Sequence, residues 1–365
     1  MTRERLPEKQ PLEATEVKFA CDAIFSWDYE SSVDELRNLY AKGIDLQWHA
    51  VRDLDWGLEI DLRSFAESFT MGGLQIQATK FWQTLPLETR CEIARRTAEF
   101  SLSQQLHGEQ GGLMTASQMV SEVPDMDGKF YAACQAIDEA RHLEVFSAYV
   151  KKLGTIQPIT PALDSLLRST FQADDWMFKA VSNQLVLEGL ALYSFRDMRA
   201  VTSEPLFKQL LTYVIRDEAR HVAFGLQYLR RVVGRVSEQR RAELEDFSFE
   251  TTRMLLDPAA RSNLRDDMLR IWADVGIDPQ HVVAAIAAEY ETIRAAHRKL
   301  GHRMSAVTGF ILPTLKSVGL LSERIQRHFE QVFSRVAPPN AEKASGPLAD
   351  RLAELPANLD EWVLQ

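Results

Sequence analysis

The sequence has too few cysteines to build a disulfide framework. Only three occur in 365 residues, Cys21, Cys91 and Cys134, and they are widely separated with no Cys-x-x-Cys pair among them. A small disulfide-stabilised protein and a zinc ribbon are therefore both excluded. A reducing cytoplasm is the compartment that fits this cysteine usage.

Long apolar runs and an excess of basic residues are also missing. No apolar stretch approaches the ~18 residues that a membrane span needs, and the charged start at residues 1–9 is not followed by the apolar segment of a leader peptide. Lys and Arg number 42 against 52 Asp and Glu, which gives a net charge of −10. We therefore expect a soluble protein without a membrane or nucleic-acid partner.

No stretch of the chain alternates apolar and polar residues in the way that a half-buried strand does, so we expect an all-α fold. Prolines and glycines instead divide the middle of the sequence into long helical segments. The predicted helices there span 87–123, 125–153, 163–201 and 204–234, and a loop at 155–161 crosses between the two pairs.

A pentapeptide that occurs twice is the most informative feature of the sequence. Asp-Glu-Ala-Arg-His spans residues 138–142 and returns at 217–221. On a helix, Glu139 and His142 project from one face, and so do Glu218 and His221, because residues three apart are neighbours there. Each copy is therefore a Glu-x-x-His pair of the kind that holds a metal in a helix bundle.

Two further glutamates keep the same register. Glu109 lies 30 residues before Glu139 (139 − 109), and Glu188 lies 30 before Glu218 (218 − 188), so every member of one set is 79 residues from its equivalent. This spacing indicates an internal duplication of a helix pair. A single such Glu or His is as well explained by an exposed helix charge or a core histidine, but six residues in register favour a metal site.

Four carboxylates and two histidines suit two iron ions, because carboxylates can bridge metals while one imidazole binds each. A mixed manganese–iron pair stays open. Asp138 and Asp217 can accept the remaining ring N–H of a bound histidine, and Arg141 and Arg220 can neutralise buried carboxylates. The alternative for these four is a set of solvated helix charges.

The repeated motif with its two outlying glutamates resembles the carboxylate-bridged di-iron oxygenases of the ferritin-like superfamily. It is similar to the hydroxylase subunits of bacterial multicomponent monooxygenases and to benzoyl-coenzyme A epoxidase. More distantly it resembles arylamine N-oxygenases and the small subunit of ribonucleotide reductase. The resemblance covers residues 87–235 and implies a ferritin-like four-helix bundle with additional N- and C-terminal helices.

The resemblance also implies how the six ligands divide. Glu109, Glu139 and His142 would bind one iron, and Glu188, Glu218 and His221 the other, with Glu139 and Glu218 as bridging ligands. It further implies O₂ as co-substrate, a ferredoxin or reductase as electron donor, and a homodimer.

Three positions depart from these relatives. Phe146 stands where the reductase subunit has its radical tyrosine, Val214 where arylamine N-oxygenases have an additional histidine, and Leu192 where multicomponent monooxygenases have a threonine. We therefore expect no stable tyrosyl radical at residue 146. A proton relay would use another group, such as water or Thr115, and we expect Tyr193 to be a core residue.

Glycines flank the ligands at positions 108, 111, 112, 189 and 225. A glycine in a helix interior costs about 1 kcal/mol relative to alanine, so five near one site indicate either a substrate cavity or close helix packing. Both readings stay open. His107 is two residues from Glu109 on the helix and is expected to be structural.

We expect a single all-α domain over residues 1–365 with its di-iron core at 87–235. An N-terminal arm and helices occupy 1–86, C-terminal helices occupy 236–336, and a tail follows at 337–365. Outside the core, helices are predicted at 32–42, 61–84 with an interruption at Gly72-Gly73, 237–256, 262–275, 279–299 and 305–335. Trp48 and Trp56 are expected to anchor a connecting loop to the bundle rather than to stack on a substrate.

The pattern predicts a non-haem di-iron oxygenase or oxidase that activates O₂ to oxidise a small organic substrate in an apolar pocket. The alternative is a ferroxidase or other metal-handling protein of the ferritin-like class, without an organic substrate. About 200 residues outside the core favour the enzyme. The substrate, and the choice among hydroxylation, epoxidation, N-oxygenation and desaturation, stay open.

Overall fold

The computed structural model describes residues 16–18, 22–68, 76–299 and 306–336, together with residues 348 and 352. Within these ranges every regular element is a helix, and no strand occurs. The prediction of an all-α fold is therefore confirmed. The first 15 residues of the predicted N-terminal arm and most of the predicted tail at 337–365 lie outside the described residues.

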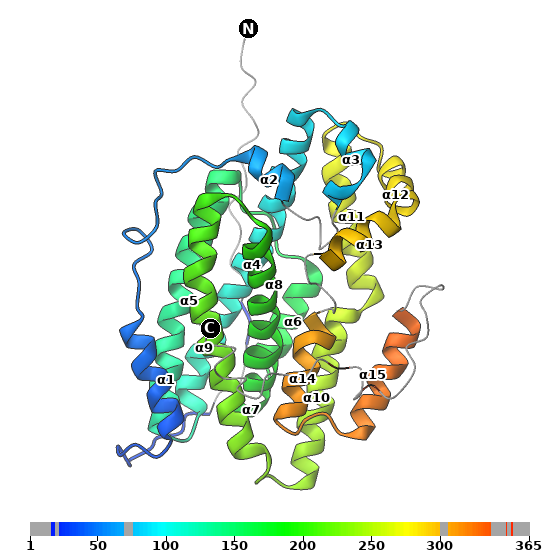
Figure 1. Cartoon of the computed structure of the whole chain (residues 1–365). Helices are drawn as coiled ribbons and strands as arrows, with labels where there is room; N and C mark the ends of the chain where they lie inside the picture. Colours follow the sequence, from blue (N-terminus) through cyan, green and yellow to red (C-terminus); the bar gives the residue numbers. More distant parts are fainter. Residues whose placement is uncertain are drawn as a thin grey trace.

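Four long helical elements form the bundle at the centre of the molecule (Figure 1): α4 (Leu87–Glu122), α5 (Met126–Leu153), α8 (Glu188–Val201) and α9 (Pro205–Val233). α4 packs along α5, and α8 packs along α9, so each predicted helix pair is a pair in space. The predicted bounds of α4, α5 and α9 agree with the structure to within two residues.

Local sequence fixes the ends of these helices. Asp125 caps α5 by accepting a hydrogen bond from the backbone of Gly128, and the Glu204 side chain does the same for the first turn of α9. The crossover loop after α5 is bound by Glu99 of α4, whose carboxylate accepts from the backbone N–H of Thr155 at 2.8 Å. A side chain at Gly154 would collide with that carboxylate, at 2.7 Å. Glycine is therefore required there by close approach.

The predicted continuous helix at 163–201 was wrong. Four elements replace it: α6 (Pro161–Phe171), α7 (Trp176–Lys179), the π-helix η2 (Ala180–Leu187) and α8. The Asp175 side chain accepts from the backbone of Met177 and so starts a new helix, a capping signal that the apolar pattern around it concealed. The third helix of the bundle, α8, is thus directly preceded by a π-helix.

The N-terminal elements cover one end and one side of the bundle. α1 (Asp34–Asp45) confirms the helix predicted at 32–42 and packs on α5 and α9. The single helix predicted at 61–84 is instead α2 (Leu62–Ser68), a 3₁₀ turn η1 (Ile76–Ala78) and α3 (Lys80–Thr84). The interruption predicted at Gly72-Gly73 lies outside the described residues.

The C-terminal helices pack against the α4, α6 and η2 side of the bundle. α10 (Glu238–Leu256) and α11 (Pro258–Asp274) follow the prediction. Two predicted helices are divided. Residues 279–299 form α12 (Pro279–Ala288) and α13 (Tyr290–Lys299), and 305–335 form the π-helix η3 (Val307–Ile311), α14 (Leu312–Ser317) and α15 (Glu323–Val336). Gly319 at φ +82° adopts the left-handed conformation that ends α14, a break that the helical periodicity does not reveal.

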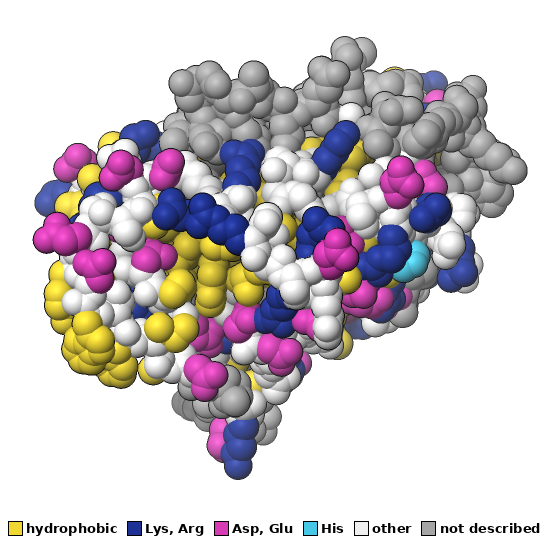
Figure 2. Space-filling view, turned by 90° about the horizontal axis from the view of Figure 1, so that it is seen from below, with side chains coloured by type: hydrophobic (Ala, Val, Ile, Leu, Met, Phe, Trp, Pro, Cys, Tyr) yellow, Lys and Arg dark blue, Asp and Glu magenta, His cyan; other side chains and the backbone are white. Residues whose placement is uncertain are grey.

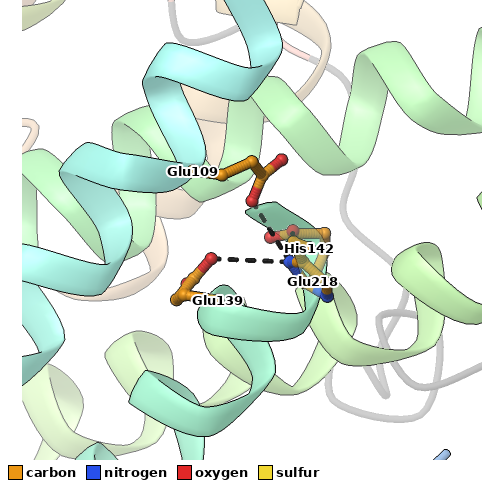
Figure 3. Close-up of side chains that lie close together, drawn as sticks. All are labelled: Glu109, Glu139, His142 and Glu218. Atoms are coloured by element: carbon orange, nitrogen blue, oxygen red, sulfur yellow. Dashed lines mark hydrogen bonds and ion pairs between the residues drawn. The ribbon is translucent and has the colours of Figure 1, made fainter. Parts of the chain in front are cut away.

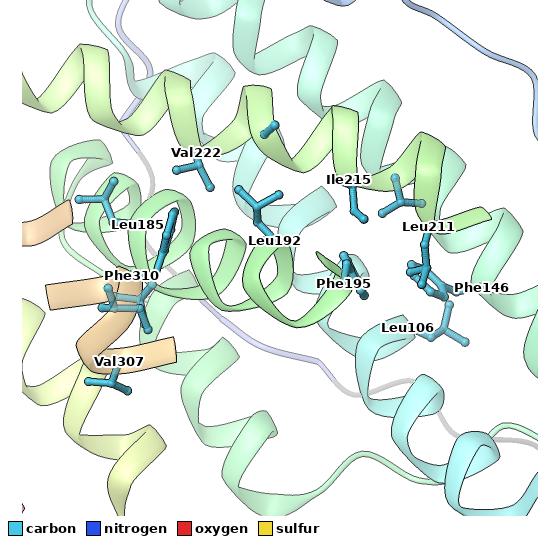
Figure 4. Packing of buried hydrophobic residues seen from close by; sticks show 14 of the residues in the cluster. Leu106, Phe146, Leu185, Leu192, Phe195, Leu211, Ile215, Val222, Val307 and Phe310 are labelled. Atoms are coloured by element: carbon cyan, nitrogen blue, oxygen red, sulfur yellow. The ribbon is translucent and has the colours of Figure 1, made fainter. Parts of the chain in front are cut away.

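Apolar side chains from all four bundle elements meet in one core (Figure 4). Phe146 of α5 stacks on Phe195 of α8 with ring centroids 5.4 Å apart, and Leu211 of α9 lies beside them. On the face shown in Figure 2, acidic and basic side chains are interspersed around a hydrophobic patch. Among the described residues, no helix is both long and apolar enough to cross a membrane.

Candidate metal centre

All six predicted ligands lie in the middle of the bundle and are buried. Glu109 comes from α4, Glu139 and His142 from α5, Glu188 from the first residue of α8, and Glu218 and His221 from α9. None is more than 5% exposed. Figure 3 shows four of these side chains pointing toward one another from three helices.

Three carboxylates surround the Nδ1 atom of His142. It lies 3.1 Å from Oε2 of Glu109, 3.4 Å from Oε2 of Glu139 and 3.1 Å from Oε1 of Glu218. These four residues offer ligand atoms that all fall within 4.8 Å of one another. That spacing is short enough for one cation to contact all of them.

The second histidine has an equivalent environment. The Nδ1 atom of His221 lies 3.2 Å from Oε1 of Glu139, 3.7 Å from Oε2 of Glu188 and 3.3 Å from Oε2 of Glu218. Glu139 and Glu218 therefore each direct one oxygen toward His142 and the other toward His221. A carboxylate between two cations takes this arrangement when it bridges them.

Several atoms of the cluster lack any other partner. Within the described part of the chain, Oε2 of Glu139, both carboxylate oxygens of Glu218 and both ring nitrogens of His221 are buried without a hydrogen-bond partner. Buried polar atoms in this condition are costly unless something binds them. Carboxylate oxygen and imidazole nitrogen are donors that iron and manganese accept, so the residues present fit a di-metal centre.

The acid–base properties of the cluster point the same way. Burial, aided by the charge of Glu188, raises the pKa of Glu139 well above its usual range and that of Glu218 to about 8. Burial lowers the pKa of His142, but hydrogen bonds to the surrounding carboxylates outweigh it and leave that pKa well above its ordinary value. Without cations, protons must compensate the crowded carboxylates.

The two aspartates support the histidines in a crossed manner. Asp217 lies 3.2 Å from Nε2 of His142, and Asp138 lies 3.5 Å from Nε2 of His221. Each histidine is thus paired with the aspartate of the other pentapeptide, and its Nδ1 faces the ligand cluster. For His142 the contact is a hydrogen bond, which orients the ring, whereas the longer Asp138–His221 distance is an electrostatic contact only.

The arginines connect these aspartates into one buried network. Arg141 contacts Asp138 and lies 3.2 Å from Asp217, while Arg220 lies 3.0 Å from Asp138 and 2.6 Å from Asp217. Two positive and two negative charges balance within it. The pairing offsets the cost of burying each charge alone.

The tryptophan-containing connector also reaches this network. The Trp48 indole donates to Asp217 at 2.7 Å, and the Gln47 amide donates to Asp138 at 3.0 Å. Trp56 donates to the backbone oxygen of Ala50 at 2.7 Å and so closes the loop on itself. The expected anchoring of the connector is what the structure shows, and neither indole lines the cavity described below.

Comparison with known proteins decides the family. Residues 30–309, more than half of the chain, match the family model described as "P-aminobenzoate N-oxygenase AurF". The chain belongs to this family. The motif had indicated that arylamine N-oxygenases are more distant relatives, and Val214 was noted as a departure from them. The match shows that valine at this position is compatible with membership.

This AurF-family chain is also similar to solved structures of R2-like ligand-binding oxidases with a Mn/Fe cofactor. One variant reconstituted aerobically shares 17% identity with a TM-score of 0.41, covering 74% of this chain and 93% of the other. Another, reconstituted anaerobically, shares 18% identity with a TM-score of 0.42, covering 71% and 93%. No curated protein matches the chain. Family membership and the carboxylate–histidine cluster make the chain a di-metal oxygenase or oxidase of an organic substrate.

Three buried amides position the predicted ligands of this AurF-family chain, and sequence reasoning missed them. Gln135 donates to Glu139 and to Glu188, at 3.0 Å each, and receives a hydrogen bond from Gln184 at 2.8 Å. Asn183 donates to Glu188 at 2.7 Å. Gln135 lies four residues before Glu139, so helical spacing alone could have predicted that the two side chains share one face of α5. Asn183 lies five residues before Glu188. Residues five apart share one face in a π-helix but not in an α-helix, so α-helical spacing could not have predicted this contact.

The glycines divide between the two explanations. Gly108 and Gly112 line a cavity; a Cβ atom at Gly108 would meet nothing within 4 Å, whereas one at Gly112 would lie 3.0 Å from the Glu139 carboxyl carbon. Close packing explains the others, where a Cβ atom would lie under 3.0 Å from a neighbouring side chain: Gly111, Gly189 and Gly225.

A cavity of about 300 Å³ reaches the cluster from the side of the C-terminal helices. Its walls come from α4, α5, α6, η2, α8, α10 and α11, and three of the six predicted ligands face it: Glu109, Glu139 and Glu188. Leu163, Leu166 and other apolar side chains form most of the remaining wall. The size suits one small organic molecule beside the ligands.

The other residues considered from the sequence lie apart from this cavity. Thr115, Leu192 and Phe146 are buried, Tyr193 is half-buried, and none of them lines it. His107 lies 2.8 Å from the backbone oxygen of Gln157 in the crossover loop, which is the structural role expected for it.

Proposed function

We propose that this AurF-family member is a non-haem di-iron enzyme that uses O₂ to oxygenate a small organic substrate. The observation that carries the proposal is the continuity between the ligand cluster and the apolar cavity. A substrate in that cavity lies directly against the ligand carboxylates. The family name favours an aromatic amine as substrate and N-oxygenation as the reaction.

The six ligands are proposed to hold the irons as the sequence predicts. Glu109 and His142 would hold one iron, and Glu188 and His221 the other. Glu139 and Glu218 would be shared by both, because each directs one carboxylate oxygen toward His142 and the other toward His221. A manganese–iron pair would use the same donors.

When bound, the metals supply O₂ activation and electron transfer. The chain's own groups prepare the site for this. The Asp–Arg network holds both imidazoles in one orientation, and Gln135 with Asn183 fixes the carboxylates of Glu139 and Glu188. The apolar cavity walls position the substrate and exclude water.

The electrons are proposed to come from a ferredoxin or reductase, since no flavin or nicotinamide signature occurs in the sequence. A reducing cytoplasm is supported by Cys91 and Cys134, both of which are free thiols. A homodimer is proposed on the resemblance to di-iron oxygenases alone.

The experiment loads the protein with Fe(II) without O₂, adds a chemical reductant and an aromatic amine, and then admits isotopically labelled O₂. We expect substrate-dependent O₂ consumption and labelled oxygen in the product, measured by mass spectrometry. The matched control is Glu218→Ala, which removes a proposed bridging ligand. Release of ferric mineral with no effect of any organic substrate would instead establish a metal-handling protein and overturn the proposal.

A further inference from the structure

The cavity beside the metal centre carries no group that can pair with an anion. Among the residues that the structure describes, none of those lining it is Lys, Arg or His. Its charged members are Glu109, Glu139 and Glu188, which face the metal positions. A carboxylate on the substrate would therefore lie in an apolar cavity beside other carboxylates without a basic partner, which is unfavourable.

Neutral amides take the place of basic groups in the wall: Gln104, Gln105, Asn183 and Asn263. Asn263 is exposed to solvent, and two of the others are already committed to the protein. Gln104 accepts from the backbone of Thr160 at 2.8 Å and donates to the oxygen of Pro158 at 2.9 Å, and Asn183 donates to Glu188. These amides keep the wall and the ligands in place and have little capacity left for a substrate.

Gln105 differs from these two. It lines the cavity and is half-buried, and within the described ranges its side-chain amide has no hydrogen-bond partner. It shares one face of α4 with Gly108, Glu109 and Gly112, all of which line the same cavity. One turn separates it from Glu109, a rise of ~6 Å along the helix axis. A molecule spanning that distance would contact both the Gln105 amide and the metal centre.

Gly108 keeps the path between these two positions open. It lies between Gln105 and Glu109, and a Cβ atom placed there would meet no other atom within 4 Å. Leu163, Leu166 and Leu187 also line the cavity and offer only apolar contact. The space thus has a reactive end, an apolar middle and one neutral polar end.

We infer that this site selects an uncharged substrate, with its reacting group at the metals and a neutral hydrogen-bonding group held by Gln105. The inference rests on the proposed function for the identity of the reacting end. The inference distinguishes this chain from an enzyme whose substrate is p-aminobenzoate itself. The carboxylate of that compound would lie next to the neutral Gln105 amide, where no basic side chain can pair with it. Gln105 is the residue that determines this specificity.

The test measures binding rather than turnover. Fe(II)-loaded protein kept free of O₂ is titrated with p-aminobenzoate and with its methyl ester, which has the same ring and amine but no charge. We expect the ester to bind at least about tenfold more tightly than the acid. The charge of the acid would lose hydrogen bonds to water and gain no charge-assisted hydrogen bond in the cavity. Equal or tighter binding of the acid, or no binding of either compound, would overturn the inference.

A charge introduced at the selecting position provides the complementary measurement. Gln105→Arg should shift the ratio of the two binding constants toward the acid by about tenfold or more. If the Arg variant does not fold, Gln105→Lys should produce the same shift. Gln110→Arg is the matched control, because Gln110 lies on the same helix but is exposed and outside the cavity. No shift in either Gln105 variant, or an equal shift in the control, would contradict the role of Gln105. Tight ester binding without any O₂-dependent product would instead refute the proposed function alone.

Discussion

Gly225→Ala should disturb the metal centre from a position that is not a ligand. The new Cβ atom would lie 2.4 Å from Cβ of Gln184 in η2, and the two elements must separate by about 1 Å to reach ordinary contact. Rotation of the Gln184 side chain cannot relieve this contact, because Cβ is fixed to the backbone. The π-helix itself must therefore move.

That movement acts on the ligands through the amide chain. Gln184 donates to Gln135 at 2.8 Å, and a displacement of about 1 Å along this bond would exceed hydrogen-bonding distance. Gln135 in turn holds both Glu139 and Glu188. Overpacking costs about 1–3 kcal/mol, and the gain from alanine in a helix offsets about 0.5–1 kcal/mol of it. We expect a net loss of about 0–2.5 kcal/mol and fewer than two metals bound per chain.

The assay compares the melting temperature of the metal-free protein and its metal content after dialysis, by elemental analysis. Gly108→Ala is the matched control, since its Cβ atom meets nothing within 4 Å and should raise stability by about 0.5–1 kcal/mol with metal binding unchanged. Wild-type melting and two bound metals in Gly225→Ala would refute the reasoning that this glycine is required for helix packing beside the ligands.

Two further predictions concern groups outside the ligand set. Burial raises the pKa of Glu99, but hydrogen bonds from Thr155 and Gln157 outweigh it and keep that pKa below its usual value. The ionised Glu99 therefore stabilises the folded protein above the ordinary carboxylate pKa. This stabilisation is lost as the pH falls through the pKa of Glu99 in the folded state. Glu99→Gln should therefore lower the melting temperature at pH 7, by the equivalent of about 1–3 kcal/mol, and the difference from wild type should narrow below about pH 4; a constant difference across that range would contradict the assignment. Trp48→Phe removes the donor to Asp217 and should cost about 1.5–3 kcal/mol in thermal unfolding, and a variant as stable as wild type would show that the indole contributes only packing.

The repeated pentapeptide was sufficient to predict the centre of the fold because its information is local. Glu139 and His142 need only a helix to share a face, and the 79-residue offset relates the two helix pairs without any knowledge of their packing. The bounds of α4, α5 and α9 follow from proline and capping side chains that lie at their ends.

What the sequence did not reveal depends on contacts between distant segments. The crossing of Asp138 to His221 and of Asp217 to His142 is decided by how α5 lies against α9. The π-helix that turns Asn183 toward Glu188 has no signature in apolar periodicity. For the same reason a glycine beside a cavity, such as Gly108, cannot be told from one that permits close packing until the opposing wall is known.

Diffraction from crystals of the iron-loaded protein, with anomalous scattering measured at the iron absorption edge, shows directly where iron binds. We expect two iron peaks inside the buried cluster, with one oxygen of Glu139 and one of Glu218 directed at each and the imidazoles of His142 and His221 on opposite irons. A single peak, or iron bound outside this cluster, would contradict this expectation.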